Sequence, residues 1–261
     1  MKQNLRAAQR PRFAKAAIKR QRRLILSIVV ALALLIAGGW GIFWHVQQQE
    51  QQTLSPYSIR GCVIDQEDGI VNFQDLAKQK VKFVYLNATT GATYFDDSFN
   101  TNYDRLRATN LKVGVVHNFS FERSAVKQLQ YISRKVKSNT GQLPVVIRVS
   151  YYGEDTAEKV DWKKQGPILA DLVRRLANYY GQPVVIKTTP EIRQRLYPKY
   201  VKQSRFWLEA EKVQKADRHV EFVEYDDQRT LKTDRREIEL PVSYFNGGRS
   251  VTIQIFDHRF Q

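Results

Sequence analysis

The first chemical feature of the chain is a short apolar stretch, residues 142–154, which reads QLPVVIRVSYYGE. Its Val and Ile content predicts a strand over residues 144–150, bounded by Gly141 and Gly153. Near the end of this strand stand Arg148 and Ser150. A guanidinium is always charged, and a hydroxyl is neither a general acid nor a general base at neutral pH. The chemistry we expect of Arg148 is therefore charge pairing or the binding of an anion.

Carboxylates follow an earlier apolar run, residues 59–65. Asp65 stands two positions beyond Val63 and projects from the same face of this predicted strand, and Glu67 and Asp68 follow in the loop. Two interpretations remain open. These carboxylates supply acid–base chemistry, or Asp65 is the counter-charge of Arg148. We favour the ion pair, because a buried guanidinium requires a partner.

The elements that must position these groups alternate along the chain from residue 57 onward. Short apolar strands are separated by amphipathic helices, which is the pattern of a parallel (β/α) barrel with active groups at its strand ends. The predicted strands are 59–65, 82–87, 112–117, 144–150, 183–187, 205–209 and 220–225. The predicted helices are 72–79, 99–109, 124–136, 162–180 and 191–196.

The first 56 residues predict a membrane anchor. Residues 24–44 form an uncharged apolar run of 21 residues, enough to cross a bilayer as a helix. Nine Lys or Arg and no acid precede it, which predicts that the tail, residues 1–23, is cytoplasmic and the rest extracellular. Residues 45–56 are Gln-rich and predict a linker. A cleaved signal peptide is the alternative, but its apolar core is shorter.

The remaining composition excludes some function classes. The formal net charge is +16, but nine of these charges belong to the tail, so we do not expect a nucleic-acid-binding protein. The sequence contains neither a nucleotide-binding loop nor the spacing of metal ligands, and we expect no cofactor and no metal. The single cysteine, Cys62, lies inside a predicted strand, which predicts a buried and inert thiol.

Fragments spread over residues 59–247 resemble the family 25 glycoside hydrolases, the lysozyme-like muramidases. The matching segments, in chain order, are GCVIDQEDGIVNF (61–73), KFVYLNATTG (82–91), YFDDSF (94–99), LKVGVVHNF (111–119), FWL (206–208) and YFNG (244–247). Each fragment is short, but their order and spacing follow the family. The resemblance implies a single family 25 type barrel, TIM-like, over residues 57–261.

The departures from the family lie at its acidic groove positions. The resemblance places the family's opening catalytic Asp on Val63 and its Asp-x-Glu pair on Arg148 and Ser150. Other family positions fall on Thr90, Asn87, Val116 and Pro241. Glycoside hydrolysis requires a carboxylic acid and a second carboxylate, so the resemblance implies the fold and removes the usual catalytic groups.

The groove that the resemblance implies retains side chains able to contact a glycan. Tyr152, Trp207 and Tyr225 stand near strand ends where a sugar could stack, and Asn87 and His117 supply hydrogen-bonding groups. With Asp65, Arg148 and Ser150 they form the predicted ligand-binding set.

The sequence thus predicts a single-pass membrane protein whose extracellular family 25-like domain is a catalytically inactive pseudoenzyme. Its expected partner is peptidoglycan or another cell-wall glycan, or a protein of wall assembly. One alternative is an active membrane-bound muramidase that uses the relocated carboxylates Asp65 and Glu67. Another is a purely protein-interacting module whose groove is filled by Arg148 and its partners.

Overall fold

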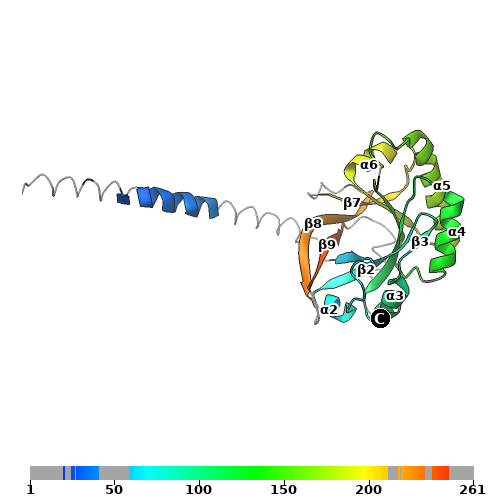
Figure 1. Cartoon of the computed structure of the whole chain (residues 1–261), viewed down its shortest axis with the longest axis horizontal. Coiled ribbons are helices and arrows are strands. Elements are labelled where there is room, and N and C mark those ends of the chain that lie inside the picture. Colours follow the sequence, from blue (N-terminus) through cyan, green and yellow to red (C-terminus); the bar gives the residue numbers. More distant parts are fainter. Residues whose placement is uncertain are drawn as a thin grey trace, which may run out of the picture. The chain divides into compact units, whose positions relative to one another are not determined.

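The computed structural model describes residues 20, 25–26, 28–40, 59–153, 155–210, 217, 219–232 and 237–246. For residues 225–232, 237–239 and 241 the description is of the backbone. The chain divides into two compact units, Met1–Pro56 and Tyr57–Gln261 (Figure 1). The predicted linker and all of the predicted tail except Arg20 lie outside the described residues.

The described part of the first unit is helical over residues 28–40. Its large apolar side chains are exposed, among them Leu35 and Trp40. Among the residues that the structure describes, no helix combines the length and the apolar character needed to cross a bilayer. The predicted span, residues 24–44, extends beyond the described residues at both of its ends.

The second unit is a closed barrel. Its sheet has the order β1-β9-β8-β7-β6-β5-β4-β2-β3, and an additional β1–β2 pairing closes it. All pairings around the barrel are parallel except those of β9, which is antiparallel to β1 and β8. The strands are β1 (Arg60–Ile64), β2 (Val81–Thr90), β3 (Tyr94–Phe95), β4 (Lys112–Asn118), β5 (Val145–Val149), β6 (Val184–Thr188), β7 (Arg205–Glu209), β8 (Val220–Lys232) and β9 (Glu237–Phe245).

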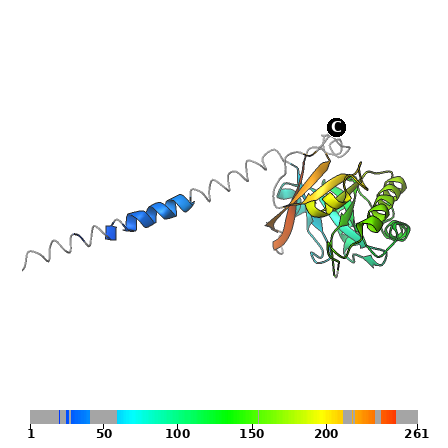
Figure 2. The same cartoon turned by 90° about the horizontal axis from the view of Figure 1, so that it is seen from above.

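Helices cover the outside of the barrel, where α4 and α5 lie side by side (Figures 1 and 2). The helices are α2 (Phe73–Lys78), α3 (Phe99–Arg107), α4 (Ala125–Val136), α5 (Trp162–Tyr180) and α6 (Pro190–Leu196). Local signals define their ends. Ser124 and Asp161 accept hydrogen bonds from backbone N–H groups in the first turns of α4 and α5, and Gly181 ends α5 in the left-handed conformation.

Two apolar cores hold the barrel together. The larger core lies between the sheet and the helices and includes Cys62, whose thiol is fully buried as predicted and has its pKa raised by burial. The inner core fills the barrel with large side chains, including Tyr85 and Trp207. Gly114 makes room for this filling, because a Cβ atom at that position would lie 2.2 Å from the Tyr85 ring.

The predicted α/β barrel is confirmed, with three differences in its strands. β2 continues to Thr90 and pairs with the short strand β3, β8 continues to Lys232, and β9 was not predicted. The sequence of β9, EIELPVSYF, contains Pro241 and two Glu residues, which are uncommon in strands and conceal the pattern.

Candidate functional site

Four consecutive barrel strands carry a charged residue on the face that points into the barrel, at or next to the C-terminal end of β5, β6 and β7 and in the first half of the long strand β8. In each strand the charged residue stands two positions after a side chain of the inner core, and side chains two apart share one face of a strand. The inner-core residues are Val146, Val185, Trp207 and Phe222, and the charged residues are Arg148, Lys187, Glu209 and Glu224. A layer of two cations and two carboxylates therefore lies above the inner core at the barrel mouth.

These four charges form one network. Arg148 Nε donates to Glu209 Oε1 over 2.9 Å, and Lys187 Nζ lies 3.2 Å from the same oxygen. Lys187 Nζ also donates to Glu224 over 2.9 Å, and Ser243 Oγ donates to the other oxygen of that carboxylate over 3.1 Å. The network is balanced in charge and links β5, β6, β7, β8 and β9.

The burial of the network changes across the mouth. The side chain of Lys187 is 3% exposed and that of Glu224 is 9% exposed, whereas Glu209 is 20% and Arg148 43% exposed. Within the described residues, the terminal NH₂ groups of Arg148 have no hydrogen-bond partner. Arg148 therefore presents free donors to solvent while its Nε is held by Glu209.

Glu209 is the carboxylate of this network that pairs with Arg148, and its surroundings favour the ionised form. Burial raises its pKa, but the positive charges of Lys187 and Arg148 and their hydrogen bonds more than offset burial, so the pKa lies below its ordinary value. A general acid at neutral pH needs a raised pKa. Glu209 is suited to pairing with cations and not to donating a proton.

The polar layer continues onto β2 and β4 without charges. Asn118 Nδ2 donates to Asn87 Oδ1 over 2.7 Å and to Thr90 Oγ1 over 3.2 Å. Asn118 is the register partner of Arg148 in the β4–β5 pairing. The half-buried amide of Asn118 thus lies on the strand next to the partly exposed Arg148, and the amide of Asn87 is bonded to it.

The three positions that the sequence resemblance aligns with the family's catalytic carboxylates, Val63, Arg148 and Ser150, carry none. Val63 is half-buried and packs against the inner core, and Ser150 is half-buried just beyond the end of β5. The predicted pairing of Arg148 with Asp65 is wrong, because the carboxylate bound to Arg148 is that of Glu209. Asp65 instead organises its own loop: its side chain accepts from the Glu67 N–H, and its N–H donates to Asp68.

Two of the predicted ligand-binding residues are buried. Trp207 is fully buried, with its ring 5.0 Å from that of Tyr85 and 5.1 Å from that of Phe222 between centroids, and Lys187 Nζ lies 5.1 Å from its ring. It forms the floor of the network and cannot stack on a sugar. The error arose because a strand end is both a mouth position and a core position, and Trp207 belongs to the core.

His117 is also fully buried, on the helix side of the sheet. Its Nδ1 lies 2.8 Å from Thr89 Oγ1 and its Nε2 lies 3.2 Å from Gln128 Oε1 of α4. Burial lowers the pKa of His117 to about 4, so the ring is neutral at physiological pH. The expected groove role of His117 is therefore corrected to a structural role.

Two predicted aromatic residues remain, Tyr152 after β5 and Tyr225 in β8. The structure describes the side chain of Tyr152 but only the backbone of Tyr225. Tyr152 is 42% exposed and stacks on Phe121, with ring centroids 6.4 Å apart. Tyr225 pairs through its backbone with Val242, and its side chain lies outside the described residues. No group of three or more His, Cys, Asp or Glu side chains in the described part of the chain is arranged to hold a metal ion.

Sequence reasoning missed Lys187, Glu209 and Glu224. The signal that identifies them is a charged residue two positions after an apolar one in each of three successive strands, a cation on β6 followed by carboxylates on β7 and β8. Such a pattern predicts paired charges at a barrel mouth, because an unpaired buried charge is strongly unfavourable.

Comparisons with known proteins agree with this architecture. The profile of the glycosyl hydrolases family 25 matches residues 64–231, more than half of the chain. The uncharacterized protein YegX of Escherichia coli K12 is 27% identical over 109 residues, and the chain spans about 40% of the length of this curated relative.

Solved structures show the same fold. A family 25 glycosyl hydrolase from Bacillus anthracis is 23% identical with a TM-score of 0.68, covering 74% of this chain and 91% of that chain. A bacterial lysozyme from Streptomyces coelicolor is 19% identical with a TM-score of 0.62, covering 74% and 94%. The modular autolysin LytC from Streptococcus pneumoniae, solved with a synthetic peptidoglycan ligand, is 14% identical with a TM-score of 0.60, covering 72% and 46%. The barrel, its closing strands and the matched profile show that this chain belongs to the glycosyl hydrolases family 25.

Proposed function

We propose that this protein is a membrane-anchored, catalytically inactive member of family 25 that binds cell-wall glycan at its barrel mouth. The observation that carries the proposal is the Arg148–Glu209–Lys187 arrangement, which puts a paired guanidinium where the family resemblance places a catalytic carboxylate. The proposal has two parts, loss of hydrolysis and retention of glycan binding.

The loss of hydrolysis follows from the charges at the mouth. Cleavage of a glycosidic bond needs one carboxyl group to protonate the leaving oxygen and a second to act as base, nucleophile or charge stabiliser. Ser150 supplies neither, and Glu209 is held ionised by two cations. Arg148 also opposes the positive charge that develops on the sugar in the transition state. Loss of the general acid alone typically lowers the rate by about 10²–10⁴-fold.

The retention of binding rests on the exposed side of the mouth. The free NH₂ groups of Arg148 and the amides of Asn87 and Asn118 can bind the hydroxyl and carbonyl oxygens of a glycan. Tyr152 adds an exposed aromatic ring on the segment that follows β5. LytC, which has this fold, was solved with a peptidoglycan ligand, which supports the choice of peptidoglycan as the glycan to test.

The proposal of a membrane anchor rests on the sequence. Residues 24–44 supply the uncharged apolar run, and the basic residues before it favour a cytoplasmic N-terminus. In the part that the structure describes, residues 28–40 are helical with exposed apolar side chains, as expected for a lipid-facing helix. The barrel then lies outside the cell, next to its proposed ligand.

A second candidate function is membrane-bound muramidase activity with relocated carboxylates, and one observation favours it. Asp96 has a pKa raised mainly by burial, with Asp65 and Asp97 adding to the rise, so this segment holds a carboxyl group that retains its proton more readily. Asp65 and the exposed Glu67 lie in the loop after β1. Against this candidate, Asp96 is 1% exposed and out of reach of a substrate.

A binding and hydrolysis assay tests the proposal. The full chain, purified in detergent, is incubated with insoluble peptidoglycan, and both the protein in the pellet and the released reducing ends are measured. We expect retention without release. We expect Arg148→Gln combined with Tyr152→Ala to lower the affinity by about tenfold, whereas the matched surface change Arg107→Gln, at the end of α3, leaves it unchanged.

Each other outcome has a defined meaning. Release of reducing ends that is abolished by Asp65→Asn or Glu67→Gln establishes the muramidase and overturns the proposal. If the variant with the Arg148 and Tyr152 changes is retained on peptidoglycan as well as the original chain, the glycan binds at a site other than the barrel mouth. A chain that neither binds nor cleaves peptidoglycan leaves the protein-interacting module, with a wall-assembly protein as partner, as the correct reading.

A further inference from the structure

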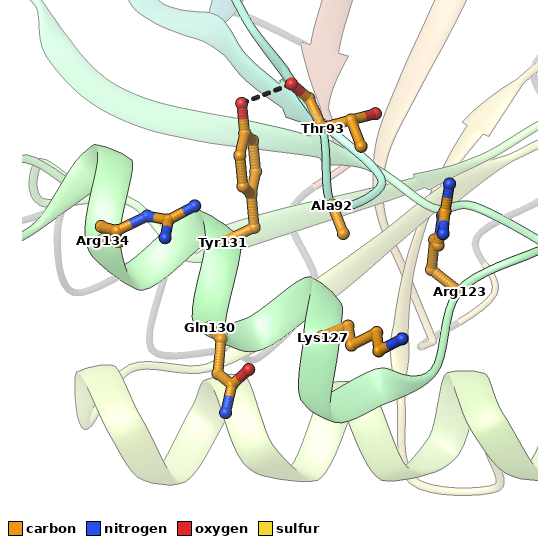
Figure 3. A pocket seen from close by; sticks show the side chains of 7 residues that line it. All are labelled: Ala92, Thr93, Arg123, Lys127, Gln130, Tyr131 and Arg134. Atoms are coloured by element: carbon orange, nitrogen blue, oxygen red, sulfur yellow. Dashed lines mark hydrogen bonds between the residues drawn. The ribbon is translucent and has the colours of Figure 1, made fainter.

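A basic pocket lies outside the barrel, between α4 and the turn that joins β2 to β3. Its volume is ≈ 240 Å³, and its lining residues are Ala92, Thr93, Arg123, Lys127, Gln130, Tyr131 and Arg134 (Figure 3). Three of these seven side chains are cationic and none is acidic. Such a lining favours an anion as the occupant.

The cations of this pocket are free to bind an external group. Arg123, Lys127 and Arg134 are exposed, and none of them forms an ion pair with a carboxylate in the described part of the chain. Helix α4 carries basic residues in its last turn and no acid in its first turn. The positive potential here is therefore not neutralised by neighbours on the same helix.

The pocket is held in shape by its neutral residues. Tyr131 Oη donates to the Thr93 carbonyl oxygen over 2.7 Å, which fastens the β2–β3 turn to α4 (Figure 3). Gly91 shapes this turn with a φ of +56°, and its N–H donates to the Asn118 carbonyl oxygen over 2.9 Å. A site whose walls are already ordered loses less entropy when a ligand binds.

The cations approach the pocket from two sides. Figure 3 shows Arg123 and Lys127 on one side of the Tyr131 ring and Arg134 on the other, where its guanidinium carbon lies 5.5 Å from the ring centroid. Two guanidinium forks, one ammonium, the Thr93 hydroxyl and the Gln130 amide can all donate hydrogen bonds. Because three cations and no acid line the pocket, a multiply charged oxyanion balances the charge better than a singly charged carboxylate does.

We propose that the pocket between α4 and the β2–β3 turn is a binding site for a phosphate-class oxyanion. The site is separate from the ion network at the barrel mouth and does not depend on glycan binding there. Free phosphate and a phosphate ester carry the same recognised group, and the experiment distinguishes them.

Ligand-observed phosphorus NMR of the full chain in a phosphate-free detergent tests the site. The probes are inorganic phosphate and glycerol 3-phosphate, with an excess of acetate at constant ionic strength as competitor. We expect both probes to bind and acetate not to displace them. Tighter binding of the ester identifies an esterified source, and equal binding identifies free phosphate.

Variants separate the pocket from the general basic charge of the chain. Arg123→Gln with Lys127→Gln should lower phosphate affinity by about tenfold or more, because hydrogen bonds to charged groups are lost. Arg107→Gln with Lys202→Gln removes the same charge from exposed positions elsewhere and should change the affinity by less than about twofold. Arg134→Gln provides a third variant on the opposite side of Tyr131.

Two results would overturn the site. One is displacement of phosphate by acetate at equal ionic strength, which indicates charge attraction without a built site. The other is an equal loss of affinity in the pocket variant and its control. Urea unfolding midpoints of all variants establish that they are folded, which is expected because every substituted side chain is exposed.

Discussion

At the scale of single residues, Lys187 is the residue on which the mouth depends. It is the most buried charge of the network and stands between the carboxylates of Glu209 and Glu224. Removing it leaves the buried Glu224 without a cation, whereas removing Arg148 leaves Glu209 still paired with Lys187. The loss of stability caused by a substitution in this network should therefore increase with the burial of the substituted side chain, and not with its number of contacts.

The difference in burial between Lys187 and Arg148 leads to a prediction about stability. Lys187→Met should lower the free energy of unfolding by about 3–5 kcal/mol, the usual cost of breaking a buried pair. Arg148→Met should cost about 0–1 kcal/mol, because its side chain is 43% exposed and water screens the pair. Urea unfolding at neutral pH measures both.

A double variant supplies the control. Glu224→Gln added to Lys187→Met should recover part of the loss, since it removes the carboxylate that loses its cation, whereas Glu209 stays paired with Arg148. Equal destabilisation by the Arg148 and Lys187 changes would show that the burial gradient across the mouth is not what determines the energy.

At the scale of elements, the barrel strands and helices could be predicted because the hydrophobic period and the length of each segment can be read directly from the sequence. Apolar runs of about five residues alternate with amphipathic helices, and the observed ends of α4 and α5 lie within one residue of the predicted ranges 124–136 and 162–180. Strand β9 was missed because it carries Pro241 and acidic residues and depends on β1, far away in sequence, for its pairing.

The site was predicted less well for a related reason. Arg148 was correctly placed near the end of its strand, whereas β2 continues three residues past Asn87. For His117 and Trp207 the face of the sheet or the depth in the barrel was not identified. His117 and Trp207 are adjacent to mouth residues in sequence or space, yet one faces α4 and the other fills the barrel. The partner of Arg148 was missed because Glu209 lies 61 residues away and becomes a neighbour only when β5, β6 and β7 pair.

The contact between β4 and α4 gives a pH prediction. The folded-state pKa of His117 is lowered to about 4 by burial, whereas the unfolded value is about 6.5. Between these two values the unfolded chain binds a proton at His117 and the folded chain does not. The free energy of unfolding is therefore highest above about pH 6.5 and falls as the pH decreases toward 4. The expected slope is about 1.4 kcal/mol per pH unit in that window.

Urea unfolding at several pH values between 7 and 4 measures this slope. His117→Gln keeps hydrogen-bonding capacity next to Gln128 without a titrating ring, and it should flatten the slope by the contribution of one proton even if its overall stability is lower. A variant with the same pH dependence as the original chain would contradict the assignment of the slope to His117.

At the scale of the whole molecule, the proposed topology places a basic segment, residues 1–23, in the cytoplasm and the barrel outside. Protease added to intact, wall-stripped cells should therefore remove the barrel and spare an epitope placed at the N-terminus. Immunoblots against the two ends of the chain measure this, and a soluble cytoplasmic protein controls for lysis. A barrel that stays protected until the cells are lysed would reverse the topology.

The ion network at the mouth limits which substitutions position 148 can tolerate. Restoring a carboxylate at position 148 alone, by Arg148→Asp, places it against Glu209, so that Lys187 alone must balance three acidic groups. Introducing a carboxylate at position 148 by single substitutions therefore passes through a destabilised protein unless position 209 or 224 changes first. The paired charges thus make the stability of the barrel, and not only its chemistry, oppose a carboxylate at position 148.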